Sequence, residues 1–96
     1  MKPSTALDRN RPAVREAVGR FRTANPRVFG SVLHGNDGEG SDLDLLVDPA
    51  PRTSLLDLAG LQIEIETRTG IKIDLRTPAE LHPRFRSKVL AEAVSL

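Results

Sequence analysis

Three aspartates and one glycine–serine pair are the residues of this sequence whose types and spacing could support chemistry. Gly30-Ser31 comes first, Asp42 and Asp44 follow on either side of a leucine, and Asp74 lies inside a later apolar segment. Carboxylate oxygens are hard ligands that suit Mg²⁺ or Mn²⁺. Two carboxylates on one strand face can bridge a pair of cations, as in nucleotidyl displacement. A third could bind one cation or accept the proton of an attacking hydroxyl.

The residues around the glycine–serine pair are candidates for contacting a nucleotide's phosphates. Gly30 allows close approach of the backbone, and Ser31 adds a hydroxyl and an N–H group. His34, in the glycine-rich loop that follows, could contact a phosphate, although a plain loop residue is the commoner role of a lone histidine. Ser41 could fix the end of this loop through a local hydrogen bond.

Each of these features has an ordinary explanation when it stands alone. An Asp-x-Asp pair at the start of a strand is usually a solvated face, and Gly-Ser is usually a turn. Asp74 alone would be an exposed strand residue or an ion-pair partner for Lys72 or Arg76. Three acids on one face of a sheet would repel one another without a cation, so their combination favours a metal site.

The elements that must position these residues follow from hydrophobic periodicity and turn signals. The predicted order is helix, strand, strand, helix, strand, helix, over residues 13–22, 27–29, 42–48, 55–69, 71–76 and 79–95. We expect residues 1–11 to be frayed or to form a separate turn, because Pro12 suits a first helical turn. In the second strand Leu43, Leu45 and Val47 should face the core, which turns the aspartates outward.

The helix between the last two predicted strands makes a crossover, which indicates parallel pairing. We therefore expect one α/β (α+β) domain over residues 1–96, with a small mixed sheet of three or four strands and helices packed on it.

Composition excludes several classes of protein. The chain has 96 residues, a formal net charge of +1, no cysteine and three aromatic residues, all of them Phe. A general basic field for nucleic acid is absent, and so are disulfides and thiolate metal sites. No apolar run approaches a membrane span. We expect a cytoplasmic protein without direct contact to nucleic acid or membrane.

The motifs together resemble the signature of the DNA polymerase β-type nucleotidyltransferase superfamily. The resemblance begins at Phe29-Gly30-Ser31, continues through a glycine-rich loop to Ser41-Asp42-Leu43-Asp44, and ends with the Asp74 strand and closing helix. The short length and the order of elements are similar to the minimal nucleotidyltransferase branch, which includes antitoxins paired with HEPN-domain toxins. The resemblance covers residues 13–94, and it implies the polymerase-β-like nucleotidyltransferase fold.

This resemblance implies a role for each candidate residue. Gly30 and Ser31 would hold the β- and γ-phosphates of ATP, with His34 and Ser41 nearby. Asp42 and Asp44 would bind two Mg²⁺ ions, and Asp74 would complete the metal site and help activate the acceptor. AMP would pass to a tyrosine hydroxyl of a cognate HEPN ribonuclease toxin, with which the chain would form a hetero-oligomer.

One position departs from the pattern. Members of the branch often carry arginine where this chain has His34, and histidine is only partly charged at neutral pH. This difference slightly favours an alternative, in which the chain is a non-catalytic antitoxin that neutralises the toxin by forming a complex. The three retained aspartates favour the enzyme, because pure binding has no use for clustered acids.

Overall fold

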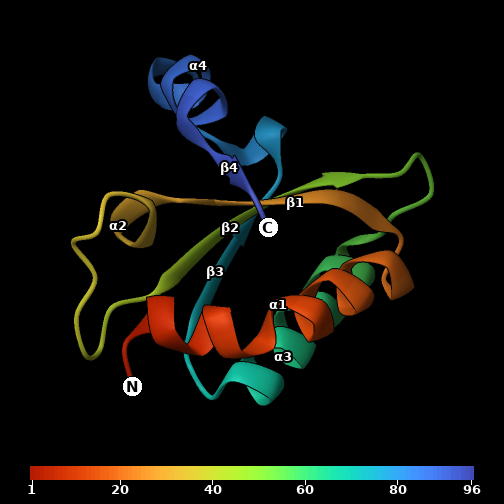
Figure 1. The fold of residues 1–96 in the computed structure, drawn as a ribbon. Helices are drawn as coiled ribbons and strands as arrows, with labels where there is room; N and C mark the ends of the chain where they lie inside the picture. Colours follow the sequence, from red (N-terminus) through yellow and green to blue (C-terminus); the bar gives the residue numbers. More distant parts are fainter.

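The chain folds around a four-stranded mixed sheet with the strand order β3-β2-β1-β4, and the computed structural model describes residues 1–96 (Figure 1). The elements are α1 (Pro3–Arg20), β1 (Thr23–Phe29), α2 (Gly30–Leu33), β2 (Leu43–Pro49), α3 (Leu55–Thr69), β3 (Ile73–Arg76), the 3₁₀ helix η1 (Pro78–Glu80), α4 (Pro83–Glu92) and β4 (Val94–Ser95). β1 pairs antiparallel with β2 and β4, whereas β2 and β3 are parallel. This architecture confirms the predicted mixed sheet with helices packed on it.

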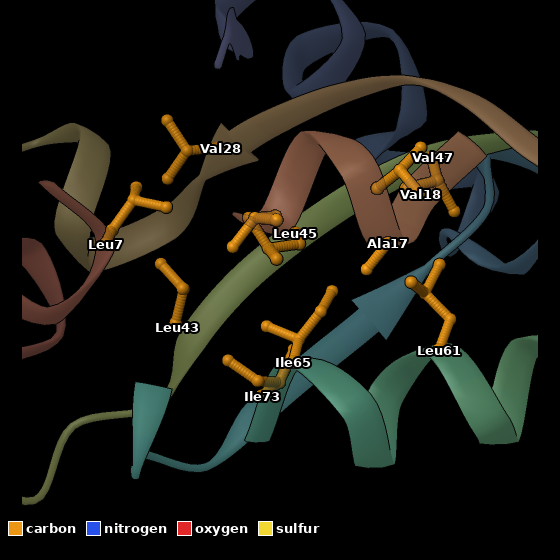
Figure 2. Packing of buried hydrophobic residues seen from close by; sticks show 11 residues of the cluster. Leu7, Ala17, Val18, Val28, Leu43, Leu45, Val47, Leu61, Ile65 and Ile73 are labelled. Atoms are coloured by element: carbon orange, nitrogen blue, oxygen red, sulfur yellow. The ribbon is translucent and has the colours of Figure 1, made fainter. Parts of the chain in front are cut away.

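The hydrophobic core lies between the sheet and the helices α1 and α3, which cover the same face (Figure 2). Leu43, Leu45 and Val47 of β2 are fully buried and belong to this core, as their alternation predicts. Helix α3 contributes Leu61 and Ile65 to it. Because alternate strand residues face opposite sides, the even-numbered residues of β2, including Asp44, lie on the other face of the sheet.

Helix α1 is longer than the sequence predicts. It begins at Pro3 rather than near residue 13, so the expectation of a frayed segment or separate turn ahead of Pro12 is wrong. A proline inside a helix removes one backbone hydrogen bond. Here Ala6 and Leu7 are fully buried on the core side, and their burial favours a continuous helix despite this loss. The Ser4 N–H also donates to Asp37 Oδ2 (2.9 Å), which ties the start of the helix to the glycine-rich loop.

Helix α3 begins and ends where its sequence signals place it. The Ser54 hydroxyl accepts from the Asp57 N–H (3.1 Å), and the Asp57 carboxylate accepts from the Ser54 N–H (2.9 Å). This reciprocal capping box satisfies N–H groups that the first turn leaves free. Gly70 ends the helix in a left-handed conformation. The crossover through α3 delivers β3 to the edge of the sheet beside β2.

The C-terminal segment differs from the single helix predicted over residues 79–95. It divides into η1, α4 and the short strand β4, which the sequence analysis missed. Helix α4 has no buried residue, and Phe85 is 54% exposed. The helix therefore lacks the row of buried apolar side chains that would pack it against the core. It lies on the opposite side of the sheet from α1 and α3 (Figure 1).

One arginine attaches α4 to the segment before it. The Arg86 guanidinium donates to the carbonyl oxygens of Pro78, Ala79 and Leu81 at 2.9, 3.2 and 2.9 Å.

No helix combines the length and the hydropathy that a membrane crossing requires.

Candidate active site

Asp44 and Asp74 lie next to each other on the sheet face that α1 and α3 leave uncovered. They are direct partners in the parallel register of β2 and β3, which runs from Leu43↔Ile73 to Leu46↔Arg76. Paired residues of neighbouring strands point to the same face. The inward positions of β2 and β3 are taken by Leu43 and Ile73, both in the core, so the two aspartates share the outer face.

The electrostatics of Asp44 reflect this crowding. Burial raises its pKa from the ordinary value of 3.8 to about 6, and the charges of Asp74 and Asp42 add to the effect. A side-chain hydrogen bond with Asp74 acts in the same direction, while the charge of Arg76 opposes it. A half-buried carboxyl facing two other acids holds its proton more tightly than an isolated one. A bound cation would offset the part of this pKa shift that the neighbouring acids add to the effect of burial.

Gly30 lies directly against Asp44. Its φ of +73° falls in the left-handed region, and a Cβ placed on it would lie 2.1 Å from Asp44 Oδ2 and 2.9 Å from Asp44 Cγ. Only glycine leaves both the backbone angle and the space free. Phe29 pairs with Asp44 in the antiparallel register of β1 and β2, which brings the start of α2 to the acid. Ser31 follows as the second residue of α2.

Asp42 precedes β2 instead of lying within it, because the strand begins at Leu43. With Ser41 it lines a hollow of about 380 Å³, whose other lining residues are Met1, Gly40, Thr69, Gly70, Ile71 and Lys72. The Ser41 hydroxyl accepts from the Gly38 N–H (3.0 Å), so the predicted local hydrogen bond in the loop is present. Asp44 and Asp74 do not line this hollow.

His34 is oriented toward another partner. It caps the C-terminal end of α2, and its Nε2 lies 3.3 Å from Glu92 Oε2 at the end of α4. The pair connects the single helical turn that begins with the glycine–serine motif to the C-terminal helix. The structure therefore brings Gly30, Asp44 and Asp74 together, with Asp42 beside them, and pairs His34 elsewhere.

The acids fit part of a magnesium site. No group of three or more Asp, Glu, His or Cys side chains is arranged to hold a metal ion. Mg²⁺ is often bound by one or two carboxylates, however, with water and substrate phosphates filling the remaining positions. Asp44 and Asp74 supply such a pair, and the space beside Asp44 that Gly30 leaves open suits a close ligand.

Two contacts of this site could not be found by sequence reasoning. The approach of Gly30 to Asp44 depends on the register of β1 and β2, which no motif encodes. The partner of His34 lies at the far end of the chain. By contrast, the i,i+2 spacing on one strand face marked Arg76 as a possible partner of Asp74, and the Arg76 Nε–H donates to Asp74 Oδ1 at 2.7 Å.

Comparison with known proteins gives a consistent result. Residues 10–96 match the family model described as a nucleotidyltransferase domain. The chain is 38% identical over 69 residues to a candidate protein adenylyltransferase of Methanocaldococcus jannaschii, covering 72% of this chain and 74% of that protein. It is 35% identical over 80 residues to the protein adenylyltransferase MntA of Thermococcus cleftensis, covering 83% and 81%.

Solved structures show the same similarity. A structure described as a candidate minimal nucleotidyltransferase superposes with a TM-score of 0.87 at 40% identity, covering 97% of this chain and 95% of that one. A chain of a toxin–antitoxin crystal structure with AMP-PNP superposes with a TM-score of 0.75 at 16% identity, covering 90% and 71%. The second likeness is one of fold.

Proposed function

Because the chain belongs to the nucleotidyltransferase-domain family and is a minimal nucleotidyltransferase, we propose that it transfers AMP from ATP to a hydroxyl group of a partner protein. The observation that carries this proposal is the register that sets Asp44 beside Asp74, with Gly30 against Asp44. The relatives named as protein adenylyltransferases support a protein acceptor. The fold shared with the toxin–antitoxin chain crystallised with AMP-PNP agrees with ATP as the donor.

In the proposed reaction the acceptor hydroxyl oxygen attacks the α-phosphorus of ATP. The new bond joins that oxygen to AMP, the bond to the β-phosphate bridging oxygen breaks, and pyrophosphate leaves. Asp74, on the edge strand β3, would accept the hydroxyl proton. Gly30 and Ser31 would contact the β- and γ-phosphates at the start of α2, with His34 and Ser41 at the borders of the same loop.

Two Mg²⁺ ions are part of the proposal: Asp44 and Asp74 would hold them together with the phosphates of ATP, and Asp42, which precedes β2, would add a third carboxylate. When bound, these ions would neutralise the charge of the triphosphate and of the leaving pyrophosphate. The carboxylates themselves fix where that neutralisation takes place, because Asp44 and Asp74 project from adjacent, hydrogen-bonded strands. Rigid strands hold such groups more accurately than loops do.

The acceptor that fits the family resemblance is a tyrosine of a cognate HEPN-type ribonuclease toxin, with this chain acting as its antitoxin. A second candidate, a non-catalytic antitoxin, is favoured by the histidine that stands where the family pattern has arginine. The pairing of His34 Nε2 with Glu92 Oε2 (3.3 Å), which engages that side chain, favours it too.

The test uses the purified chain, Mg²⁺ and the protein encoded beside it in the genome. With ATP labelled at the α-phosphate, we expect label on the partner protein, and with ATP labelled at the γ-phosphate we expect none. Asp44→Asn and Asp74→Asn should each lower the transfer rate by about 10²-fold or more, as loss of a group acting on the transition state does.

Asp48→Asn is the matched control, since Asp48 lies on the same strand and face as Asp44 but pairs with Arg27 (2.6 Å). It should transfer label at close to the wild-type rate. Inhibition of the toxin without any label on it would instead support the non-catalytic antitoxin.

A further inference from the structure

Arg76 places a positive charge at the edge of the acidic pair. It lies two residues after Asp74 on β3, so both side chains project from the same face. Its Nε–H donates to Asp74 Oδ1 at 2.7 Å, and the two side chains are 46% and 36% exposed. The bond engages one of the two oxygens that Asp74 could offer to a cation, and it is of the strong, charge-assisted kind.

The influence of Arg76 extends to Asp44. Its charge acts against the upward shift in the Asp44 pKa that burial and the other acids cause. Two other cationic residues near the site, Arg27 on β1 and Lys72 just before β3, are placed differently. Arg27 pairs with Asp48 (2.6 Å), and Lys72 forms no ion pair and lines the hollow beside Asp42. Arg76 is thus the cation in direct contact with the Asp44–Asp74 pair.

We propose that Arg76 competes with divalent cations for Asp74 and so sets the cation concentration at which the site fills. The inference rests on the proposed function, which places a cation at Asp74. A cation that binds Asp74 must share the carboxylate with the guanidinium or displace it, and the two positive charges repel each other. The half-exposed Arg76 side chain can turn toward solvent when this happens. In the cation-free protein the same ion pair offsets part of the repulsion among the acids.

The test measures binding of Mn²⁺ to the nucleotide-free protein by the loss of the electron paramagnetic resonance signal of free MnCl₂. Arg76→Met keeps an apolar chain and removes the charge, so we expect Mn²⁺ to bind about tenfold more tightly, as removal of one nearby like charge at a partly exposed site would give. Arg76→Lys should stay near wild type, and Arg76→Gln serves as a second neutral variant if Arg76→Met does not fold.

Two controls separate this competition from a general effect of charge. Arg27→Met also breaks an arginine–aspartate pair on this sheet face, and it should leave Mn²⁺ binding unchanged. In an Asp74→Asn background the effect of Arg76→Met should be lost, because the group competed for is gone. Weaker or unchanged binding in Arg76→Met, the same tightening in Arg27→Met, or no Mn²⁺ binding by either wild type or Arg76→Met would overturn the proposal.

The proposed function can fail separately from this inference. If Mn²⁺ binding tightens in Arg76→Met but no variant transfers AMP, the competition at Asp74 stands and the proposed reaction is wrong. If transfer occurs, the Mg²⁺ concentration for half-maximal rate should fall in Arg76→Met by the same factor as the Mn²⁺ dissociation constant.

Discussion

Asp44 carries an energetic cost in the folded protein at neutral pH. Its pKa is raised from 3.8 to about 6, so between these values the folded protein binds the Asp44 proton more tightly than the unfolded chain does. The free energy of unfolding therefore falls as the pH rises through this window, and it stays lowered above about pH 6. This behaviour is opposite to that of an aspartate stabilised by an ion pair.

Replacing Asp44 by asparagine removes the ionised carboxylate and should stabilise the protein when divalent cations are absent. We expect the free energy of unfolding at pH 7.5 to rise by about 1 kcal/mol, a value reduced from the full pKa shift because Asp44 is about half exposed to solvent screening. At pH 4 the gain should vanish. Urea unfolding in EDTA at both pH values measures this.

Asp48→Asn provides the contrast on the same strand. Asp48 accepts hydrogen bonds from Arg27 (2.6 Å) and Asn25 (3.0 Å), so its replacement should lower stability at pH 7.5. If Asp44→Asn lowered the stability at pH 7.5 as much as Asp48→Asn does, the crowding of acids around Asp44 would be disproved.

Gly30→Ala should lower the stability of the fold more than Gly35→Ala, although both glycines have left-handed backbone angles. Gly35 has a φ of +71° and open space where a Cβ would lie, so Gly35→Ala should cost about 1 kcal/mol of stability from backbone strain alone. Gly30→Ala adds the collision with Asp44, and we expect a total cost of about 2–3 kcal/mol.

In Gly30→Ala the Asp44 carboxylate is displaced, so it should no longer be in position to hold a cation beside Asp74. Isothermal titration with an ATP analogue and Mg²⁺ should therefore show binding in Gly35→Ala and none in Gly30→Ala. Equal binding by the two variants would show that Gly30 does not position Asp44.

At the scale of elements, the C-terminal helix is the least integrated part of the fold. Helix α4 buries none of its residues, and a helix of this length is marginal in isolation. Its N-terminal half is attached through the three bonds of Arg86 to carbonyl oxygens, and its C-terminal end through the Glu92–His34 pair. Polar contacts, rather than core packing, hold it beside the site.

Removal of the Arg86 side chain should loosen this helix without unfolding the sheet. In Arg86→Ala we expect amide hydrogens of α4 to exchange on the order of tenfold faster, which corresponds to the loss of about 1.5 kcal/mol of charged hydrogen bonding. Amides of β2 should keep their protection. Arg84 on the same helix is exposed, and Arg84→Ala should leave exchange in α4 unchanged. The same acceleration in both variants would refute the anchoring role of Arg86.

At the scale of the whole molecule, one face of the sheet forms the core and the other carries the candidate site. One face packs on α1 and α3 and supplies the core, while the other carries the acids and has α4 standing beside it (Figure 1). An acceptor protein in the proposed reaction must therefore approach from the α4 side. The period-two pattern of β2 decides which residues serve which face.

The parts of this arrangement that depend on local pattern were predictable from the sequence. The alternation in β2, the capping box of α3 and the crossover to a parallel β3 each follow from residues close together in the chain. The parts that depend on distant contacts were not. Burial of Ala6 and Leu7 extends α1 through a proline, and β4 exists through its antiparallel pairing with Arg27 and Val28 of the distant β1.

The candidate site divides in the same way. Alternation in the two strands predicts that Asp44 and Asp74 both lie on the outer face of the sheet. Their direct pairing, however, depends on the register of β2 and β3. Pairing of His34 with Glu92 required the folded position of the last helix. The roles of Asp42, Asp44 and Asp74 as metal ligands, and of Gly30, Ser31, His34 and Ser41 at the nucleotide, remain predictions.

The most direct test of the central claim is calorimetric titration of a non-hydrolysable ATP analogue in the presence of Mg²⁺, because it requires no knowledge of the acceptor. The wild-type chain and Asp48→Asn should bind the analogue only when Mg²⁺ is present, and Asp44→Asn and Asp74→Asn should lose this Mg²⁺-dependent binding while remaining folded by circular dichroism. Binding that is equally strong in all four proteins, or that does not depend on Mg²⁺, would contradict the assignment of the Asp44–Asp74 pair as the metal-assisted nucleotide site.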